Sequence, residues 1–461
     1  MFRNFADLER VHFVGVGGAG MSGIAEVLLD YDLEVSGSDQ VASETTTRLE
    51  AAGVRFSEGH DAEHVEGADL VVVSSAVPAA NPEVEAAKRL GIPVVRRAEM
   101  LGELMRLKYG IAIAGTHGKT TTTSLAGLLL TEGDLDPTVI VGGRLRVTGT
   151  GARLGRSDYM VVEADEFDRS FLRLSPIIAV LTNIDLEHLD TYRDLDDLKR
   201  AFVEFARRVP FFGEVLLCLD DPNLQAILPD LADRRVVTYG LTPQAEIVAT
   251  DVEADAGGSQ FSVRHTKHGD LGEVHLPMPG RHNVQNALAA IAVGLALGVE
   301  FENMAASLAG FRGVHRRFER LGEWQGAAVI DDYAHHPTEV EATLRASREV
   351  FPEGRLHAVF QPHLYSRTKH FAGDFGRALL AADDAIVTEI YGSREEPLQG
   401  VTGEMVVRAA RESGHRSVRF CADWKDVPPL LDGLVGPGDA VLTLGAGDIY
   451  RLGRLLVEGV A

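Results

Sequence analysis

The chain has 461 residues, 45% hydrophobic and 25% charged, a composition typical of a globular protein with roughly two to four domains. Its 45 Lys and Arg residues against 68 Asp and Glu residues leave a net charge of −23, which disfavours binding to nucleic acid or to an anionic membrane. Two cysteines, Cys218 and Cys421, exclude a disulfide framework, and no apolar stretch is long enough to span a membrane. We therefore expect a cytoplasmic protein without membrane insertion.

The first hundred residues alternate short apolar runs with segments of helical spacing. We predict strands at 11–17, 33–39 and 68–78, a helix at 19–31, and further helices within 83–108. This β-α-β order indicates a parallel, doubly wound sheet with helices on both faces.

The first predicted strand runs into a glycine-rich loop, GVGGAG. Gly15, Gly17 and Gly20 have the G-x-G-x-x-G spacing, and Asp39 follows at the end of the next strand. Glycines allow backbone N–H groups to approach a diphosphate closely, and the helix N-terminus adds its positive dipole end. The pattern therefore predicts a diphosphate-binding site. Both NAD and a UDP-sugar carry a diphosphate. A plain turn without a ligand is the alternative.

A second α/β region begins with a strand, loop and helix at 109–133. Two apolar runs that end in acidic residues follow at 159–168 and 177–185, and a long helix is predicted at 283–298. Ligands of parallel sheets bind at the carboxyl ends of the strands, so we expect a site where these runs end.

The loop GTHGKTTTT of this region has the G-K-T end of a phosphate-binding loop. Lys119 is placed to reach the β- and γ-phosphates, and Thr120 to contact Mg²⁺. The strict pattern requires glycine where this chain has Ile113, but Gly115 and Gly118 still supply N–H donors close to the phosphates.

Hard oxygen ligands for the metal of a nucleoside triphosphate are expected at the neighbouring strand ends. Glu163 in VVEADEFD and Asp185 in TNIDLEHLD qualify by position. His188 lies in the second group, although a single histidine is more often not a ligand.

A third α/β region begins near Gly313. Its predicted strands with polar loops lie within 327–339, 356–371, 384–392 and 439–451. Three α/β domains in series are therefore predicted, with boundaries at 1–107, 108–312 and 313–461.

Taken together, the motifs of the chain resemble those of the Mur ligases, the ATP-dependent amide-bond-forming enzymes of peptidoglycan precursor synthesis. The motifs occur in the order typical of that family and cover essentially the whole chain: GTHGKTTT, EADEFDRSF, TNIDLEHLDTY, GRHNVQNALAA, DDYAHHPTE and FQPHLYSRT. The resemblance implies an α/β fold of three domains: a Rossmann-like UDP-binding domain, a central P-loop ATPase-like domain and a C-terminal Rossmann-like domain that binds the amino acid.

The resemblance also explains two phosphate loops in one chain, because the first holds a UDP-sugar and the second holds ATP. The segments VHFVGVGGAGMSGIAEVL and PVVRRAEMLGELMR are similar to the branch that adds L-alanine to UDP-N-acetylmuramate. The implied cofactors are ATP and Mg²⁺, the implied pathway runs through an acyl phosphate, and a monomer or homodimer is expected.

The family pattern implies a role for each matching residue. The residues implied to bind the UDP-sugar are Gly15, Gly17, Gly18, Gly20 and Asp39. The residues implied to bind ATP are Gly115, Thr116, His117, Gly118, Lys119, Thr120, Thr121, His282, Asn283, Asn286 and Asp331. Thr120 and Glu163 hold one Mg²⁺ and His188 a second. The catalytic group is Lys119, Glu163, His188 and one of Arg316 and Arg317, and the amino-acid pocket contains Tyr333, His363 and Arg367.

Two positions depart from the alanine-adding pattern. Phe167 stands where many such members have Ser, and Leu364 stands where Arg is common. A recycling ligase, which adds a murein tripeptide by the same chemistry, is therefore an alternative. An NAD-dependent dehydrogenase and a non-catalytic nucleotide-binding regulator are further alternatives, but the dehydrogenase leaves the second loop unexplained.

Overall fold

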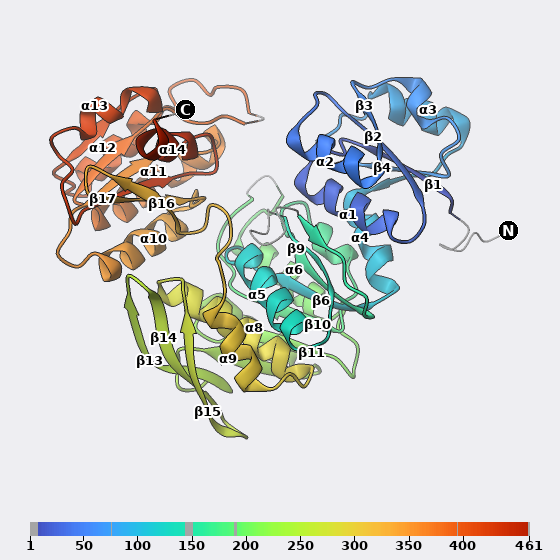
Figure 1. Cartoon of the computed structure of the whole chain (residues 1–461), viewed down its shortest axis with the longest axis horizontal. Helices are drawn as coiled ribbons and strands as arrows, with labels where there is room; N and C mark the ends of the chain where they lie inside the picture. Colours follow the sequence, from blue (N-terminus) through green and yellow to red (C-terminus); the bar gives the residue numbers. More distant parts are fainter. Residues whose placement is uncertain (1–7, 75, 143–150, 189–190, 394, 460–461) are drawn as a thin grey trace. The chain divides into compact units, whose positions relative to one another are not determined.

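The structure, a computed structural model, describes residues 8–74, 76–142, 151–188, 191–393 and 395–459. The chain forms two compact units. The first comprises Met1–Ala249, Val263–Gly272 and Gln285–Leu308, and the second comprises Thr250–Ser262, Glu273–Val284 and Ala309–Ala461. Three sheets flanked by helices confirm the predicted α/β fold of three domains, whereas the boundaries after residues 107 and 312 remain predictions (Figure 1). Within the described ranges, no helix combines the length and the apolar character that crossing a membrane requires.

The first sheet has five parallel strands in the order β3-β2-β1-β4-β5. The strands are β1 (Arg10–Val14), β2 (Glu34–Asp39), β3 (Arg55–Glu58), β4 (Leu70–Val73) and β5 (Val94–Arg96). The helices are α1 (Ala19–Leu29), α2 (Glu44–Ala52), the 3₁₀ turn η2 (Ala62–Val65), α3 (Pro82–Leu90) and α4 (Arg97–Arg106). The chain reverses its direction of winding between β1 and β4, which places a ligand crevice at the carboxyl end of β1.

The predicted helical segment 83–108 is interrupted by the edge strand β5. Helix α3 begins where the Asn81 side chain accepts from the Glu83 N–H at 2.9 Å, and it ends at Gly91. The stretch IPVV that follows contains the β-branched residues that favour an extended strand. Helix α4 then begins directly after β5.

The second sheet has ten strands in the order β15-β14-β13-β12-β11-β10-β6-β9-β7-β8. The strands are β6 (Tyr109–Ala114), β7 (Thr138–Ile140), β8 (Ala152–Arg153), β9 (Tyr159–Ala164), β10 (Ile178–Leu181), β11 (Glu214–Cys218), β12 (Val236–Gly240), β13 (Ile247–Asp255), β14 (Gly258–His265) and β15 (Gly269–Leu276). The helices are α5 (Lys119–Glu132), η3 (Ser170–Arg173), α6 (Leu195–Ala206), α7 (Pro222–Ile227), η4 (Leu228–Leu231), α8 (Arg281–Ala296) and α9 (Phe301–Ala309).

Strands β6, β9 and β10 set the position of the second phosphate loop. In the parallel register, Ala114 lies beside Ala164 on one side and beside Leu181 on the other. All three strands therefore end at the same level. The loop after β6, the acidic segment after β9 and the segment after β10 consequently meet at one edge of the sheet.

The third sheet has six strands in the order β16-β17-β21-β18-β19-β20, and β16 is antiparallel to β17. The strands are β16 (Glu319–Trp324), β17 (Ala327–Asp332), β18 (Leu356–Phe360), β19 (Asp384–Val387), β20 (Val418–Phe420) and β21 (Ala440–Leu444). The helices are α10 (Pro337–Val350), α11 (Tyr365–Ala378), η5 (Leu379–Ala381), α12 (Glu404–Glu412), η6 (Trp424–Asp426), α13 (Pro428–Leu431) and α14 (Tyr450–Glu458).

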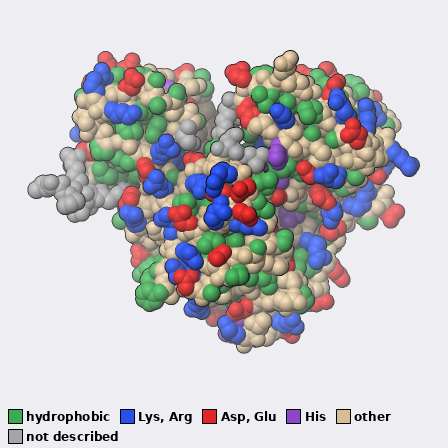
Figure 2. Space-filling model, turned by 180° about the vertical axis from the view of Figure 1, so that it is seen from behind, with side chains coloured by type: hydrophobic (Ala, Val, Ile, Leu, Met, Phe, Trp, Pro, Cys, Tyr) green, Lys and Arg blue, Asp and Glu red, His purple; other side chains and the backbone are tan. Residues whose placement is uncertain are grey.

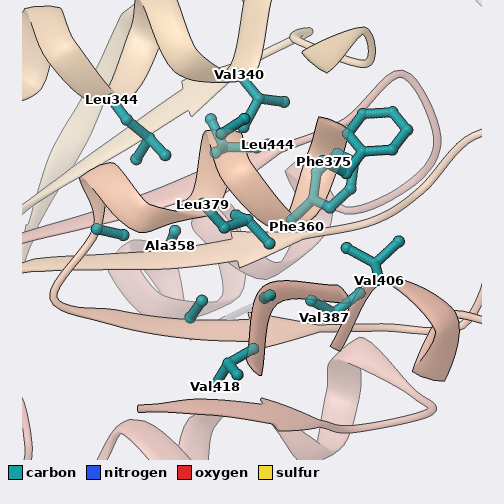
Figure 3. Close-up of a cluster of buried hydrophobic side chains, with 14 of the residues drawn as sticks. Val340, Leu344, Ala358, Phe360, Phe375, Leu379, Val387, Val406, Val418 and Leu444 are labelled. Atoms are coloured by element: carbon teal, nitrogen blue, oxygen red, sulfur yellow. The ribbon is translucent and has the colours of Figure 1, made fainter. Parts of the chain in front are cut away.

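A buried apolar cluster holds helices α10, α11 and α12 against this sheet. Leu344 of α10, Phe375 of α11 and Val406 of α12 belong to one cluster with Phe360 of β18, and the rings of Phe360 and Phe375 lie 4.9 Å apart (Figure 3). Burial of these side chains fixes the carboxyl ends of β17, β18 and β21, where the polar loops of this region begin.

A buried carboxylate supports the end of β2 in the first domain. Glu83 is fully buried, and Ser38 donates a hydrogen bond to it at 2.7 Å. The Nδ1 atoms of His60 and His64 lie 2.9 and 2.7 Å from its oxygens, and Nε2 of His12 lies 3.5 Å away. Burial alone raises the pKa of Glu83. The hydrogen bonds from His12, Ser38 and His64 outweigh burial and lower this pKa to about 2.

The pKa of Glu83 predicts a pH-dependent contribution to stability. Because the pKa falls from 4.5 to about 2 on folding, the ionised carboxylate stabilises the fold above pH 4.5, and this stabilisation is lost as the pH falls toward 2. We expect Glu83→Gln to lower the free energy of unfolding in urea at pH 7 by on the order of 3 kcal/mol. The difference from the unsubstituted chain should shrink between pH 4.5 and pH 3.

Glu85→Gln, on the exposed side of the same helix, is the matched control and should change stability little at either pH. A Glu83→Gln effect of the same size at every pH would contradict the assignment of a stabilising carboxylate.

Candidate active site

The first phosphate loop lies between β1 and α1 and is held by the end of β2. The N–H groups of Gly15 and Val16 donate to the Ser38 carbonyl at 2.8 and 2.9 Å. The Gly17 N–H donates to the Asp39 carboxylate at 2.8 Å. The structure thus brings the predicted loop and Asp39 together, and it gives Asp39 a role in holding the loop. Gly18 immediately precedes α1, and no side chain caps the N-terminus of that helix.

The second phosphate loop lies between β6 and α5. Its last glycine, Gly118, has a φ of +81° and lies so close to Asn286 that a side chain at this position has no room. Thr122 of α5 also donates to Asn286 at 3.1 Å. The predicted residue Asn286 therefore lies beneath this loop, inside the first unit.

The predicted loop residues Thr116 and His117 anchor the second loop to the segment after β10. The hydroxyl of Thr116 accepts from the Asp185 N–H at 2.9 Å. The His117 N–H donates to Asn183 at 2.8 Å, and the His117 ring lies 3.2 Å from the Asp185 carboxylate. These contacts fix the second loop to the segment after β10.

Lys119 is the cation of this loop. Its Nζ donates to Glu166 at 2.8 and 3.1 Å and to the carbonyl oxygens of Gly115 and Thr116 at 2.7 and 3.2 Å. Burial acts to lower the pKa of Lys119, but the charge of Glu166, with the weaker effects of its neighbouring acids, raises this pKa well above its usual value. The lysine therefore stays protonated throughout the physiological range.

Thr120 and Glu163 form the predicted metal pair. The Thr120 hydroxyl lies 3.0 and 3.2 Å from the two carboxylate oxygens of Glu163, and the Gly142 N–H donates to the same carboxylate at 2.8 Å. A hydroxyl and a carboxylate side by side are the hard oxygen donors that Mg²⁺ prefers, so this pair fits the expected ion. The next predicted residue, Thr121, is buried in α5.

His188 lies against the same acidic segment but at another carboxylate. Its Nε2 is 3.4 Å from Glu166, and its ring meets Phe167 edge-on at 5.1 Å between centroids. His188 has a φ of +56°, an uncommon conformation for a residue with a side chain and one that is frequent at functional sites. Its role as a second metal ligand remains a prediction.

Glu166 is the residue of this site that the sequence interpretation missed. It is fully buried, contacts both Lys119 and His188, and its carbonyl accepts from the Tyr192 hydroxyl at 2.7 Å. The segment EADEFD contains several acidic residues, and each of them is a candidate partner for the lysine of the loop. Nothing in the sequence distinguishes which of them is directed at the lysine.

A cavity of about 240 Å³ joins the two halves of this site within the first unit. It is lined by Gly18 and Gly20 of the first loop and by Gly142, Glu163 and Asp165 near the second. The remaining lining residues include Arg97 at the start of α4. The lining of this cavity therefore reaches from the first loop to Glu163 of the predicted metal pair.

In the second unit, the predicted amino-acid residues form one continuous cluster. The ring of Tyr333 contacts that of His335 at 5.2 Å, and His335 contacts His363 at 5.9 Å. Arg367 lies with Nη1 3.1 Å from Nδ1 of His363. Leu364, with a φ of +69°, immediately precedes helix α11 and lies between His363 and Arg367 in the chain.

The two predicted phosphoryl-contacting arginines differ in their surroundings. Arg316 donates to Asp331 at 3.1 Å, to Gly445 O at 2.6 Å and to Gly447 O at 3.2 Å, so its guanidinium is occupied within the domain. Arg317 lies over the ring of Tyr333 at 5.1 Å, and its nearest described acid is 3.8 Å away. The geometry favours Arg317 over Arg316 for contact with a ligand.

The remaining predicted nucleotide residues also belong to the second unit. Asp331 is buried, and its carboxylate accepts from Arg316 and from Thr443 at 2.6 Å, so it too is engaged within the domain. Burial lowers the pKa of His282 to about 4, which leaves its ring neutral at pH 7. Asn283 donates to the Pro279 carbonyl at 2.8 Å and thereby holds the start of α8.

Comparisons with known proteins cover almost the entire chain. Residues 10–109 match the Mur ligase family catalytic domain, residues 113–294 the Mur ligase middle domain, and residues 316–447 the Mur ligase glutamate ligase domain. Two relatives named UDP-N-acetylmuramate–L-alanine ligase are 52% identical (Salinibacter ruber, 98% of this chain and 95% of the relative) and 51% identical (Geobacter sp. strain M21, 98% of both).

Solved structures agree with these relatives. UDP-N-acetylmuramate-alanine ligase from Thermotoga maritima superposes with a TM-score of 0.81 at 30% identity, covering 98% of both chains. A murein peptide ligase from Psychrobacter arcticus superposes with a TM-score of 0.68 at 25% identity, covering 97% of this chain and 98% of that one. Full-length similarity at this level, together with two phosphate loops of the geometry described above, shows that the chain belongs to the Mur ligase family.

Proposed function

We propose that the chain joins L-alanine to the lactyl carboxylate of UDP-N-acetylmuramate at the expense of ATP. The observation that carries the proposal is the cavity that runs from the first phosphate loop to Glu163. Such a cavity suits a substrate with a diphosphate at one end and a reacting carboxylate at the other. The names of the relatives at about half identity support the same substrate pair.

The proposed reaction has two steps. The lactyl carboxylate attacks the γ-phosphorus of ATP, which forms an acyl phosphate and releases ADP. The amine of L-alanine then attacks the acyl carbon, the amide bond forms, and inorganic phosphate and a proton leave. In the first step two anions must approach each other, so the site must supply positive charge.

The residues of the second loop supply part of that charge. Lys119 is fully protonated and lies at the start of α5, where a triphosphate is also favoured by the N–H groups of the loop. Thr120 and Glu163 would hold Mg²⁺, which neutralises phosphate charge when bound. Glu166 keeps Lys119 in place, and Lys119 must exchange part of this ion pair for phosphate contacts when ATP binds.

The third domain contributes the amino-acid pocket in this proposal. Arg367 pairs with the carboxylate of L-alanine, and Tyr333 and His363 form the walls. Arg317 contacts the transferring phosphoryl group. A cytoplasmic location and a monomeric or dimeric state also belong to the proposal.

The recycling ligase remains the second candidate because Phe167 packs on His188 beside Glu166. An aromatic ring here, where many alanine-adding members have Ser, changes the shape of the wall next to the reacting groups. Membership of the Mur ligase family argues against a dehydrogenase. A non-catalytic nucleotide-binding regulator would show no amine-stimulated ATP hydrolysis.

The first experiment is phosphate release from ATP with UDP-N-acetylmuramate, with L-alanine, glycine, L-serine or the murein tripeptide added singly. We expect release that depends on L-alanine. Release with the tripeptide alone would assign the chain to the recycling branch, and release with none of the amines would contradict a ligase.

Lys119→Ala tests whether the second loop serves ATP turnover while the first loop binds UDP. Loss of the cation should reduce turnover by about 10³-fold or more, because the phosphoryl group loses its main charged contact. UDP binding, measured by calorimetry, should remain nearly unchanged because the first loop does not include this residue. Lys88→Ala, at an exposed position of α3, is the matched control and should leave both quantities unchanged. Normal turnover in Lys119→Ala would contradict the assigned role.

A further inference from the structure

The cavity between the two phosphate loops has a single basic residue among its lining side chains. Its walls include the acidic residues Glu163 and Asp165, and Arg97 is the one Lys or Arg that the described lining contains. The net charge of the chain is −23. A diphosphate entering this cavity therefore faces two carboxylates, and one guanidinium is available to offset them.

Arg97 differs from several nearby arginines in having no acidic partner among the described residues. On the face shown in Figure 2, basic and acidic side chains are interspersed over the surface. Arg169, Arg173 and Arg208 each pair with an acid, at 2.7, 4.0 and 3.1 Å. Among the described residues, no carboxylate lies within ion-pair distance of Arg97, although the side chain is half-buried. A guanidinium without a carboxylate partner keeps its N–H donors available to an anionic ligand.

Arg97 lies close to the first phosphate loop. A Cβ atom on Gly20 would lie 2.8 Å from Nη1 of Arg97 and 3.2 Å from its Cδ, so the arginine covers the backbone of this glycine. Gly20 is the second residue of α1, whose N-terminus is the expected diphosphate site. The third glycine of the motif therefore makes room for a cation beside the phosphates.

The composition of the two loops shows why the first one needs this residue. The second loop carries its own cation, Lys119, whereas the first loop, residues 15–20, has the sequence GVGGAG and contains no basic side chain. Backbone N–H groups and a helix dipole favour a phosphate, but they carry no full charge. A cation from another element would add a full positive charge to this site.

We infer that Arg97 is the cation that binds the diphosphate of the UDP-sugar, with its guanidinium donating to phosphate oxygens beside Gly20. The inference rests on the proposed function, because it takes the ligand of the first loop to be a UDP-sugar. Arg97 is thereby a substrate-binding residue from α4, contributed to a loop that lies between β1 and α1. Its planar fork suits two phosphate oxygens at once, which a lysine ammonium does not reproduce.

The test is the dissociation constant for UDP, UDP-N-acetylglucosamine and UDP-N-acetylmuramate, measured by calorimetry on the full chain. Arg97→Ala should weaken all three by about 10- to 100-fold, the loss expected for hydrogen bonds to a charged group. Arg97→Lys should fall between Arg97→Ala and the unsubstituted chain. Arg96→Ala is the matched control, because Arg96 is the adjacent exposed arginine and does not line this cavity; its three constants should be unchanged.

Three results would overturn the inference. UDP binding by Arg97→Ala and Arg97→Lys equal to that of the unsubstituted chain would show that the diphosphate does not use this residue. A loss confined to UDP-N-acetylmuramate would assign Arg97 to the lactyl carboxylate, because UDP and UDP-N-acetylglucosamine lack that group. An equal loss in Arg96→Ala would indicate a general charge effect. Thermal unfolding checks that each variant is folded.

The outcome is separable from that of the proposed function. If the unsubstituted chain releases phosphate with L-alanine and binds UDP, but the Arg97 variants bind normally, only the inference fails. If the unsubstituted chain neither binds UDP nor releases phosphate, the proposed function fails and the inference fails with it.

Discussion

The ion pair between Lys119 and Glu166 is the interaction on which the arrangement of the site depends. A fully buried carboxylate is stable only with cationic or donor partners, and here the lysine of the phosphate loop supplies the main one at 2.8 Å. The same pair fixes the lysine at the start of α5 and keeps it charged. His188 joins this carboxylate from the segment after β10. One acid thus orders the cation and the histidine that the family pattern connects with phosphoryl transfer.

The sheet determines that these groups meet. Because β9, β6 and β10 are adjacent, parallel and in register at their ends, the three following segments begin at one level. Each segment is short and polar, and each contacts its neighbour: Thr116 with Asp185, and Thr120 with Glu163. The precision of the site therefore comes from strand register, and the loops are held by hydrogen bonds at both sides. This is the physical basis for carrying family roles to these positions.

Much of this arrangement follows from local sequence. Both phosphate loops and the helices after them were predictable, because glycine spacing and strand ends are encoded over a few residues. The pairing of Thr120 with Glu163 followed only from the family resemblance, because Asp185 qualified equally by position. Glu166 was missed because neighbouring acids in EADEFD have no periodicity that tells which one is buried. Strands β13 to β15 were passed over, although Phe261 and Val263 alternate with polar residues. Edge strand β5 was hidden between two helical segments, since its three residues are too few to show a period.

Arg97 could not be recognised from the sequence for a different reason, which is where each site has its cation. In the second loop the cation lies within the motif, so the sequence pattern alone reveals an anion site. In the first loop the motif supplies only backbone donors, and the charge lies in the segment RRAEML on a later helix. Two adjacent arginines at the start of a helix are indistinguishable in sequence from an ordinary solvated surface. Only the contact with Gly20 and the shared cavity separate Arg97 from Arg96. In this chain, the helix that packs on the last glycine of the first loop therefore supplies the charge that the loop itself lacks.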